Sequence, residues 1–196
     1  MNYDYTRFLL RGWIFHFFGR QRTAYAAYAE AFRINGNSAH AAKALGYIDA
    51  QRKHYHQAVG WYREAVRIAP DDAGNWYNLG YVLAEDGFRQ EAAEIFRKAV
   101  ALSPEMDRAW YGMGLALAHE GDHAGAAEAF QQAADRQPMH GAVWYHLGMA
   151  RLYCCQPEHV EKAIRHLAEF DPRTCHRLIV DTDRSDLEHL VHDRLL

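Results

Sequence analysis

The chain has 196 residues, of which 49% are hydrophobic, so it is long enough to bury a core and lies near the usual upper size of one domain. Its formal net charge is −3. The protein therefore does not produce the strongly positive field that attracts polyanions, and nucleic acid is not an expected ligand. Its three cysteines, of which two are adjacent, argue against a disulfide framework and favour reduced thiols in the cytoplasm.

An apolar segment over residues 8–18 is the first predicted element. Arg11 and His16 interrupt it, and Asp4 precedes it, a composition that does not match a secretory signal peptide. The segment is also shorter than the ~20 apolar residues that a membrane span requires. We therefore expect it to be retained as part of the fold and not to cross a membrane.

A 34-residue period dominates the sequence between residues 5 and 174. Five kinds of position return in phase: a glycine, an alanine, a large aromatic residue, a second alanine and a closing proline. The residues are Gly12, Gly46, Gly80, Gly114 and Gly148; Ala24, Ala58, Ala92 and Ala126; Tyr28, Tyr62, Phe96 and Phe130; Ala31, Ala65, Ala99 and Ala133; and Pro70, Pro104, Pro138 and Pro172. This phasing indicates a repeat architecture.

Each period predicts a hairpin of two helices, as residues 73–104 illustrate. Gly80 and Ala92 lack bulk, so two antiparallel helices can approach closely there. Gly87 suits the tight turn between the helices, and Pro104 ends the second helix. One hairpin cannot bury its apolar faces alone, so neighbouring hairpins must stack. The predicted fold class is therefore all-α.

The pattern closely resembles the tetratricopeptide-repeat (TPR) family, whose Trp, Leu-Gly, Ala, aromatic, Ala and Pro positions are all present in residues 73–106 and 107–140. The resemblance implies a right-handed solenoid of about five helix-turn-helix repeats. Residues 39–72 form a further repeat, in which Ala42 stands in place of the tryptophan and Asp49 in place of an apolar residue.

The two ends of the chain depart from the family pattern, as expected where a solenoid meets water. Residues 1–38 form a degenerate first helix pair, and residues 141–174 a degenerate fifth repeat. In the fifth repeat, the segment Cys154–Pro157 is expected to lengthen the turn and to shift the second helix by about one turn.

A C-terminal capping helix is predicted within residues 175–196. Ser185 resembles an N-cap residue, and an apolar stripe follows it. The stripe consists of Leu187, Leu190, Val191 and Leu195. We expect it to cover the last hairpin.

No group of histidines or cysteines has the spacing of a complete metal site. The candidates are His54 with His56, His119 with His123, His189 with His192, and His159 with Cys154 and Cys155. The histidine pairs lack further ligands at a fixed spacing, and those at turns are interpreted as solvated side chains. The cysteines are interpreted as a small buried residue beside a surface thiol. We therefore expect no metal and no cofactor.

Catalytic motifs are absent from the sequence as well. It has no phosphate-cradling glycine loop, no nucleophile elbow and no zinc-protease helix motif. The repeat pattern accounts for the glycines by packing. We therefore expect no catalytic residues and no enzymatic activity, although fold alone never decides function.

The resemblance to the TPR family implies a partner-binding groove, because the first helix of each pair lines the concave surface. The implied groove residues are Lys43, Tyr47, Tyr77, Asn78, Tyr81, Arg108, Tyr111, Leu115, Tyr145, His146, Met149 and Tyr153. They form an aromatic, sparsely charged set of the kind that recognition sites favour. A tyrosine after the repeat tryptophan is ordinary consensus, so the more informative positions are Tyr47, Tyr81, Leu115 and Met149.

One TPR subclass binds the carboxylate-ended tails of heat-shock chaperones through two lysines, two asparagines and an arginine. Lys43, Asn78 and Arg108 match three of these positions, whereas Tyr47 and Gly112 stand where an asparagine and the arginine should be. The substitutions remove much of the carboxylate chelation, so a complete clamp is not expected.

A second interaction surface is predicted on the N-terminal segment, where four apolar residues should project into the end of the groove. These residues are Leu9, Leu10, Trp13 and Phe17. Residues 1–38 carry five arginines against Asp4 and Glu30, a local charge of +3, so the rest of the chain sums to −6. A basic aromatic helix can lie on an anionic membrane or dock on a partner. The plainer interpretation is that it fills the first groove and caps the solenoid.

The expected function is that of a soluble adaptor or assembly chaperone whose groove holds an extended or helical segment of one or more partner proteins. One alternative is a self-associating scaffold, a homo-oligomer in which the groove takes the aromatic N-terminus of another copy. A second alternative is a membrane-surface adaptor that uses its basic aromatic helix. The expected location is the cytoplasm, either free or peripheral to the inner face of a membrane.

Overall fold

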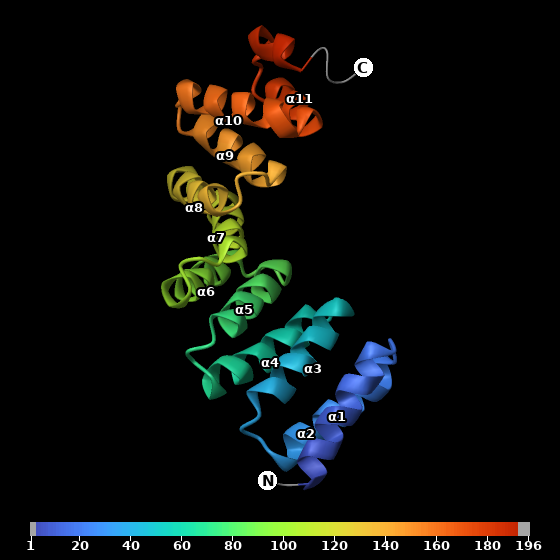
Figure 1. Ribbon diagram of the computed structural model, residues 1–196. Coiled ribbons are helices and arrows are strands. Elements are labelled where there is room, and N and C mark those ends of the chain that lie inside the picture. Colours follow the sequence, from blue (N-terminus) through green and yellow to red (C-terminus); the bar gives the residue numbers. More distant parts are fainter. Residues whose placement is uncertain (1–2, 192–196) are drawn as a thin grey trace. The chain divides into compact units, whose positions relative to one another are not determined.

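The computed structural model describes residues 3–191, and all regular secondary structure in that range is helical (Figure 1). The chain forms two compact units, Met1–Leu102 and Ser103–Leu196. The helices of unit 1 are α1 (Tyr3–Phe17), α2 (Gln21–Ile34), α3 (Ala39–Gln51), α4 (Tyr55–Ile68), α5 (Ala73–Glu85) and α6 (Arg89–Leu102). Those of unit 2 are α7 (Asp107–His119), α8 (His123–Arg136), α9 (Gly141–Tyr153), α10 (Pro157–Phe170), α11 (Pro172–Asp181) and the 3₁₀ helix η1 (Ser185–Leu190).

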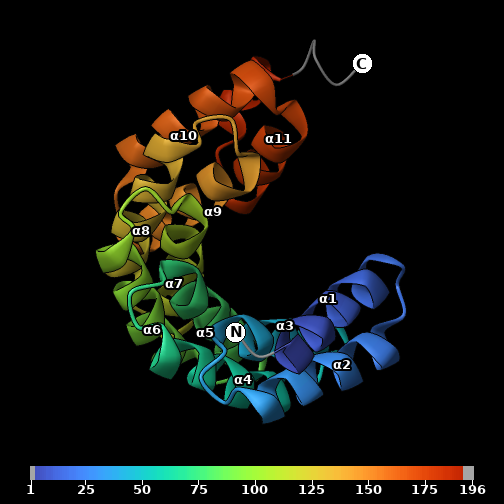
Figure 2. The same ribbon diagram turned by 60° about the horizontal axis from the view of Figure 1, so that its bottom comes forward.

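Helix pairs are the building blocks of both units. In unit 1 each helix packs against the next one along the chain, from α1 to α6. In unit 2 the same holds from α7 to α11, and α11 also packs against α9. The turned view in Figure 2 shows α1 and α2 as the hairpin at the blue end of unit 1. The prediction of an all-α fold made of helix-turn-helix repeats is confirmed.

Every pair is joined by the same three-residue turn. The middle residue of each turn has a positive φ, and the third residue donates its backbone N–H to the carbonyl five positions earlier, at 2.8 to 3.0 Å, as in a Schellman motif. The middle residues are Gly19, Lys53, Gly87, Gly121 and Cys155. They recur every 34 residues, so the repeat extends to the backbone conformation.

The expectation of a lengthened turn in the fifth repeat is wrong. Cys155 adopts the left-handed conformation, with φ 55°, that glycine provides in other turns. Pro157 is the first residue of α10, where its missing N–H needs no partner and its fixed φ already suits a helix. Because α8 begins at His123, 34 residues earlier, the second helix of the fifth repeat keeps its register.

Small residues let the two helices of a pair meet closely. A Cβ atom added to the repeat glycine in any of the first four pairs would lie within 3.0 Å of an aromatic ring on the second helix. The pairs are Gly12 with Tyr28, Gly46 with Tyr62, Gly80 with Phe96 and Gly114 with Phe130. Four buried aromatic rings therefore fill the places where glycine omits a side chain.

The repeat tryptophan and proline are linked by a hydrogen bond. The indole Nε1 donates to the backbone carbonyl of the proline six residues earlier. The distances are 2.6 Å from Trp76 to Pro70, 2.8 Å from Trp110 to Pro104 and 2.7 Å from Trp144 to Pro138. This bond fixes the loop that leads into the first helix of the pair. Ala42 occupies the tryptophan position of the second repeat and cannot make this bond. In the same repeat, the indole Nε1 of Trp61 donates to the hydroxyl of Tyr25 at 3.1 Å.

The C-terminal cap begins directly after α10. Asp171 caps α11 by accepting a hydrogen bond from the backbone of Thr174, and α11 buries Cys175, Leu178 and Ile179 completely. In the tail, Leu187 and Val191 are buried and Leu190 is partly buried, as the stripe predicted. Leu195 lies outside the described residues.

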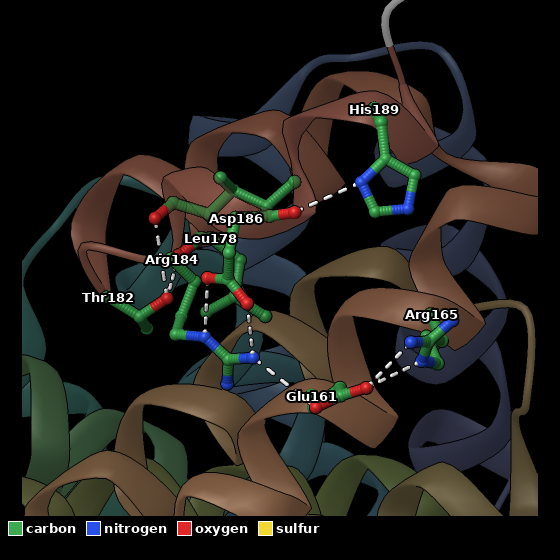
Figure 3. Close-up of polar contacts among 8 residues, drawn as sticks. Glu161, Arg165, Leu178, Thr182, Arg184, Asp186 and His189 are labelled. Carbon is green, nitrogen blue, oxygen red and sulfur yellow. Dashed lines mark hydrogen bonds and ion pairs between the residues drawn. The ribbon is translucent and has the colours of Figure 1, made fainter.

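The α-helix predicted to start at Ser185 is wrong in type, because residues 185–190 form a 3₁₀ helix. Arg184 holds it against the unit: its guanidinium bonds Asp186 at 2.9 Å and Glu161 of α10 at 3.3 Å (Figure 3). The pKa of Glu161 is lowered by its bonds with Arg165 and then Arg184, and the pKa of Asp186 is lowered by its bond with Arg184. The cap is therefore fixed by apolar burial and by an ion-pair network.

Candidate functional site

Unit 1 contains a hollow of about 330 Å³ walled by aromatic and imidazole rings. The first helices α1, α3 and α5 supply most of the wall, and α2 and α4 each supply one tyrosine. The lining residues are Trp13, His16, Tyr28, His40, Lys43, Ala44, Tyr47, Tyr62 and Asn78. Such a hollow suits an apolar or aromatic side chain whose neighbouring amides can reach polar groups at the rim.

Ring contacts hold this wall in place. The rings of His16 and Tyr47 lie 5.5 Å apart, and those of Tyr28 and His40 lie 6.3 Å apart. Burial raises the pKa of Tyr28 and of Tyr62, so both phenols stay protonated near neutral pH. Tyr47 is half exposed at the rim and accepts a hydrogen bond from the Gln51 amide at 2.9 Å.

Lys43 is the cation of this hollow, and part of its charge is already balanced. Its Nζ lies 3.3 Å from a carboxylate oxygen of Asp72. Asp72 is itself the N-cap of α5 and accepts the backbone N–H of Gly74 at 2.8 Å. A carboxylate of a ligand would therefore compete with Asp72 for Lys43. This competition is a further reason not to expect a carboxylate clamp.

Unit 2 contains a second hollow, of about 510 Å³. It is formed by α7, α8, α9 and α11, and its lining again combines rings with aliphatic side chains. The residues are Leu115, Ala118, His119, His123, Phe130, Tyr145, His146, Met149, Ala150, Tyr153 and Arg177. Tyr153 is exposed at the rim and stacks on His123, with the ring centres 4.3 Å apart.

His146 is the lining residue of the unit 2 hollow that makes the most ring contacts. Its ring stacks on Phe130 at 5.5 Å and contacts Tyr111 at 5.8 Å. Burial, together with the positive charge of Arg177, lowers its pKa, so the imidazole is neutral at physiological pH and can both donate and accept a hydrogen bond.

Arg177 is held over Tyr145. Its guanidinium lies 4.4 Å from the centre of the Tyr145 ring and 3.5 Å from Asp181, and the Tyr145 hydroxyl donates to Asp181 at 2.6 Å. The arrangement fixes a cation at the edge of the hollow. Arg177 was not among the predicted site residues, because no helix was predicted to begin at Pro172.

The structure brings together eight of the twelve predicted groove residues in these two hollows. They are Lys43, Tyr47 and Asn78 in unit 1, and Leu115, Tyr145, His146, Met149 and Tyr153 in unit 2. Tyr77 and Tyr111 instead pack against the core rings Phe96 and Phe130. Tyr81 and Arg108 are exposed and line neither hollow.

Several lining residues were not predicted from the sequence. His119 and His123 were expected to be solvated turn residues; His119 is exposed, His123 is partly buried, and both line the unit 2 hollow. His16 and His40 line the unit 1 hollow. Isolated histidines carry no spacing signal, so only the helix packing shows that they share a site with the tyrosines.

The residues of the predicted second surface separate into three environments. Leu9 packs against the core of unit 1, because it lies on the side of α1 that faces α2. Trp13 lines the unit 1 hollow. Leu10 and Phe17 are exposed and line neither hollow, so the expectation that all four project into the groove is wrong.

Among residues 3–191, no three histidine, cysteine, aspartate or glutamate side chains are grouped so that they could hold a metal ion. Over the same range, no helix is long and apolar enough to cross a membrane.

Comparison with protein families matches most of the repeat region. A tetratricopeptide-repeat family model matches residues 77–138 and 121–152, and a second TPR-repeat model matches residues 46–87. Comparison with curated proteins finds no match.

Solved TPR structures share the fold at low sequence identity. YrrB, a TPR protein with an unusual peptide-binding site, is 21% identical, with a TM-score of 0.79 over 90% of each chain. MamA from Desulfovibrio magneticus RS-1 is 22% identical, with a TM-score of 0.77 over 87% of this chain and 99% of its own. PilF of Pseudomonas aeruginosa is 20% identical, with a TM-score of 0.73 over 98% of this chain and 90% of its own. At such identities the likeness shows the fold alone.

Proposed function

Since the chain belongs to the tetratricopeptide-repeat family, we propose that it is a non-enzymatic adaptor or assembly chaperone that binds a segment of a partner protein. In each unit, the partner contacts the faces of the first helices and places an apolar or aromatic side chain in the hollow of that unit. The peptide-binding site of YrrB, a structural neighbour, is consistent with this use of the fold.

One observation carries the proposal: each unit has a ring-walled hollow with an exposed tyrosine at its rim, Tyr47 in unit 1 and Tyr153 in unit 2. An exposed tyrosine offers a large contact area and a hydroxyl group at a low entropy cost. Neutral phenols, an amide and imidazoles around it can bond the backbone of a bound segment. Few charges must be desolvated, so burial of an apolar side chain there is favourable.

The expected ligand is an apolar or aromatic segment and not an acidic chain terminus. A carboxylate would meet Lys43 already paired with Asp72, and the other cation, Arg177, is paired with Asp181. Both pairs are partly exposed, so displacing them would bring little net electrostatic gain.

Site-specific photo-crosslinking in cells tests this function. A benzophenone amino acid is placed at Tyr47 or at Tyr153, and as matched controls at two exposed apolar residues outside the hollows, Phe88 and Met139. We expect the same partner to be crosslinked from both rim positions and from neither control. Crosslinks to another copy of the chain would instead support a self-associating scaffold. Equal crosslinking from all four positions would contradict a specific site.

A further inference from the structure

The outward side of α1 is covered by large apolar side chains. Leu10, Trp13 and Phe17 are 56, 57 and 73% exposed, and Phe18 in the following turn is 70% exposed. At about 100° per residue, positions 10, 13, 14 and 17 fall on one side of a helix. Gly12, by contrast, is buried against the ring of Tyr28 in α2.

These side chains form one continuous patch. The rings of Trp13 and Phe17 are stacked 6.0 Å apart, and those of Phe17 and Phe18 meet edge to face at 5.4 Å. Burying such rings in water-free surroundings is strongly favourable, so a contiguous exposed patch of this kind marks an interaction surface.

The α1–α2 hairpin that bears the patch also carries positive charge that no ion pair balances within residues 3–191. Arg11, Arg20 and Arg22 are exposed and make no ion pair within residues 3–191. The other arginines of this segment are balanced, Arg7 by Asp4 and Arg33 by Glu30. The same hairpin thus carries three guanidinium groups without an ion pair in this range and the exposed rings of the patch; the Arg11 guanidinium lies 5.5 Å from the centre of the Phe15 ring.

The end of the α1–α2 hairpin adds a hollow of about 440 Å³. Ile14, Phe15 and Phe18 form its apolar wall, and Arg20 lies at its edge. An apolar cleft with a guanidinium at the edge matches the two ends of a phospholipid, since the acyl chain requires apolar contact and the phosphate requires a cation.

We propose that the exposed face of α1, together with the α1–α2 turn, binds the surface of an anionic phospholipid bilayer. The aromatic rings enter the boundary between headgroups and acyl chains, and Arg11, Arg20 and Arg22 contact lipid phosphates. This combination of exposed aromatic rings and arginines is that of an interfacial helix, which lies in the plane of the membrane and does not cross it.

A second copy of the chain fits this face less well. Symmetric pairing of α1 with α1 would bring the unpaired arginines of two copies together, and like charges across an interface oppose association. An anionic bilayer satisfies the arginines and the apolar rings at once. The proposal goes beyond partner binding in the hollows; the two surfaces share Trp13, which lines the unit 1 hollow, whereas Leu10, Phe17 and Phe18 belong to the patch alone.

Vesicle binding of the full chain tests the proposal. Co-flotation is measured with vesicles of phosphatidylcholine alone and of phosphatidylcholine mixed with phosphatidylglycerol. We expect binding to the anionic vesicles, weakened by salt. Changing Phe17→Ser and Phe18→Ser together should lower the partition coefficient by roughly tenfold or more. Changing Arg11→Gln and Arg20→Gln should lower it by about fivefold for each arginine, whereas the exposed-aromatic control Phe88→Ser should bind like the wild type.

Tryptophan quenching locates the inserted helix. Brominated acyl chains should quench the fluorescence of Trp13, and the quenching should be lost in Trp13→Phe. Circular dichroism confirms that each variant is folded. Absence of binding to anionic vesicles at low salt would overturn the proposal, as would undiminished quenching in Trp13→Phe. A dimer seen by light scattering without lipid, and abolished by the Phe17→Ser and Phe18→Ser changes, would show that a second copy occupies this face instead.

Discussion

Leu178 of α11 lies directly against Gly148 of α9: a Cβ atom at Gly148 would be 2.7 Å from Leu178 Cδ2. In the first four helix pairs, an aromatic ring from the second helix of the same pair takes this place. The corresponding residue of the fifth pair is Ile164, which is fully buried but smaller than an aromatic ring. The last repeat is therefore completed by the cap.

Shortening Leu178 should destabilise unit 2 strongly. Leu178→Ala removes a fully buried side chain and leaves a cavity over Gly148, so the free energy of unfolding should fall by about 2–5 kcal/mol. Gly148→Ala should also destabilise, because the new methyl group would collide with Leu178. In the double variant the shorter side chain at position 178 makes room for the new methyl group. Its free energy of unfolding should therefore fall by less than the sum of the decreases in the two single variants.

Denaturant unfolding of the four proteins measures this coupling. Gly60→Ala is the matched control, because a Cβ atom at Gly60 in α4 meets nothing within 4 Å. It should stabilise the protein by about 0.5–1 kcal/mol. Strictly additive losses for Gly148 and Leu178 would show that the two residues do not share the space.

The positive-φ position of the turns should respond oppositely to glycine and to alanine. Cys155 has φ 55° and is exposed, so Cys155→Gly should relieve about 1 kcal/mol of backbone strain, partly offset by the greater entropy of glycine in the unfolded chain. Gly121→Ala, at φ 83°, should destabilise by about 1–2 kcal/mol. The melting temperatures of both variants test this prediction. An unchanged melting temperature for Gly121→Ala would contradict a turn conformation shared by the repeats.

Asp49 is a buried carboxyl at a leucine position of the repeat. It is 4% exposed, its Oδ2 makes no hydrogen bond within the described residues, and Leu83 is the corresponding residue of the next repeat. Burial raises its pKa, so the folded state holds the proton to a higher pH than the unfolded state does. Stability is therefore lost as pH rises from the unfolded pKa of about 4 through the folded value.

Asp49→Leu should remove the loss of stability that accompanies ionisation of Asp49 at rising pH. The variant should be more stable than the wild type at neutral pH, by about 1–3 kcal/mol, and the gap should narrow as the pH is lowered toward 4. The measurement is urea unfolding across this pH range. A less stable variant at pH 7 would mean that the contacts of Asp49 with His54 and Tyr25 outweigh its burial.

His146 should make unit 2 sensitive to acid. Its pKa is lowered by burial and by Arg177, so below the unfolded pKa of about 6.5 the unfolded chain takes up a proton that the folded chain resists. Stability should then fall as the pH drops through this range, and His146→Phe should flatten the dependence. His176→Gln, at an exposed position of α11, is the control. An unchanged pH profile in His146→Phe would contradict the burial of a neutral imidazole.

The repeat positions could be predicted from the sequence because each has one packing role. Gly114 and Phe130 are complementary in volume, and the same step of 34 residues places such a pair in four successive hairpins. The fifth turn could not be predicted, since Cys155 takes a conformation that residue type alone assigns to glycine. Pro157, which was expected to belong to a lengthened turn, is the first residue of α10.

The candidate site was only partly predictable for a similar reason. Family resemblance places Tyr47 and Tyr153 on first helices, and the structure sets both at the rims of hollows. Arg177 enters the site from the cap, a segment outside the repeat pattern, and His16 comes from the degenerate first pair. Periodicity carries no information about such contributions.

The most direct measurement of the central claim is the affinity of the crosslinked partner segment for purified wild-type and variant chains, determined by isothermal titration calorimetry. Tyr47→Ala and Tyr153→Ala are combined, because both side chains are exposed and should contribute little to stability. We expect the double variant to fold normally and to lose affinity by more than about tenfold, or roughly 1.4 kcal/mol, while Phe88→Ala binds like the wild type. A normally folded double variant that retains full affinity would contradict binding in the two hollows.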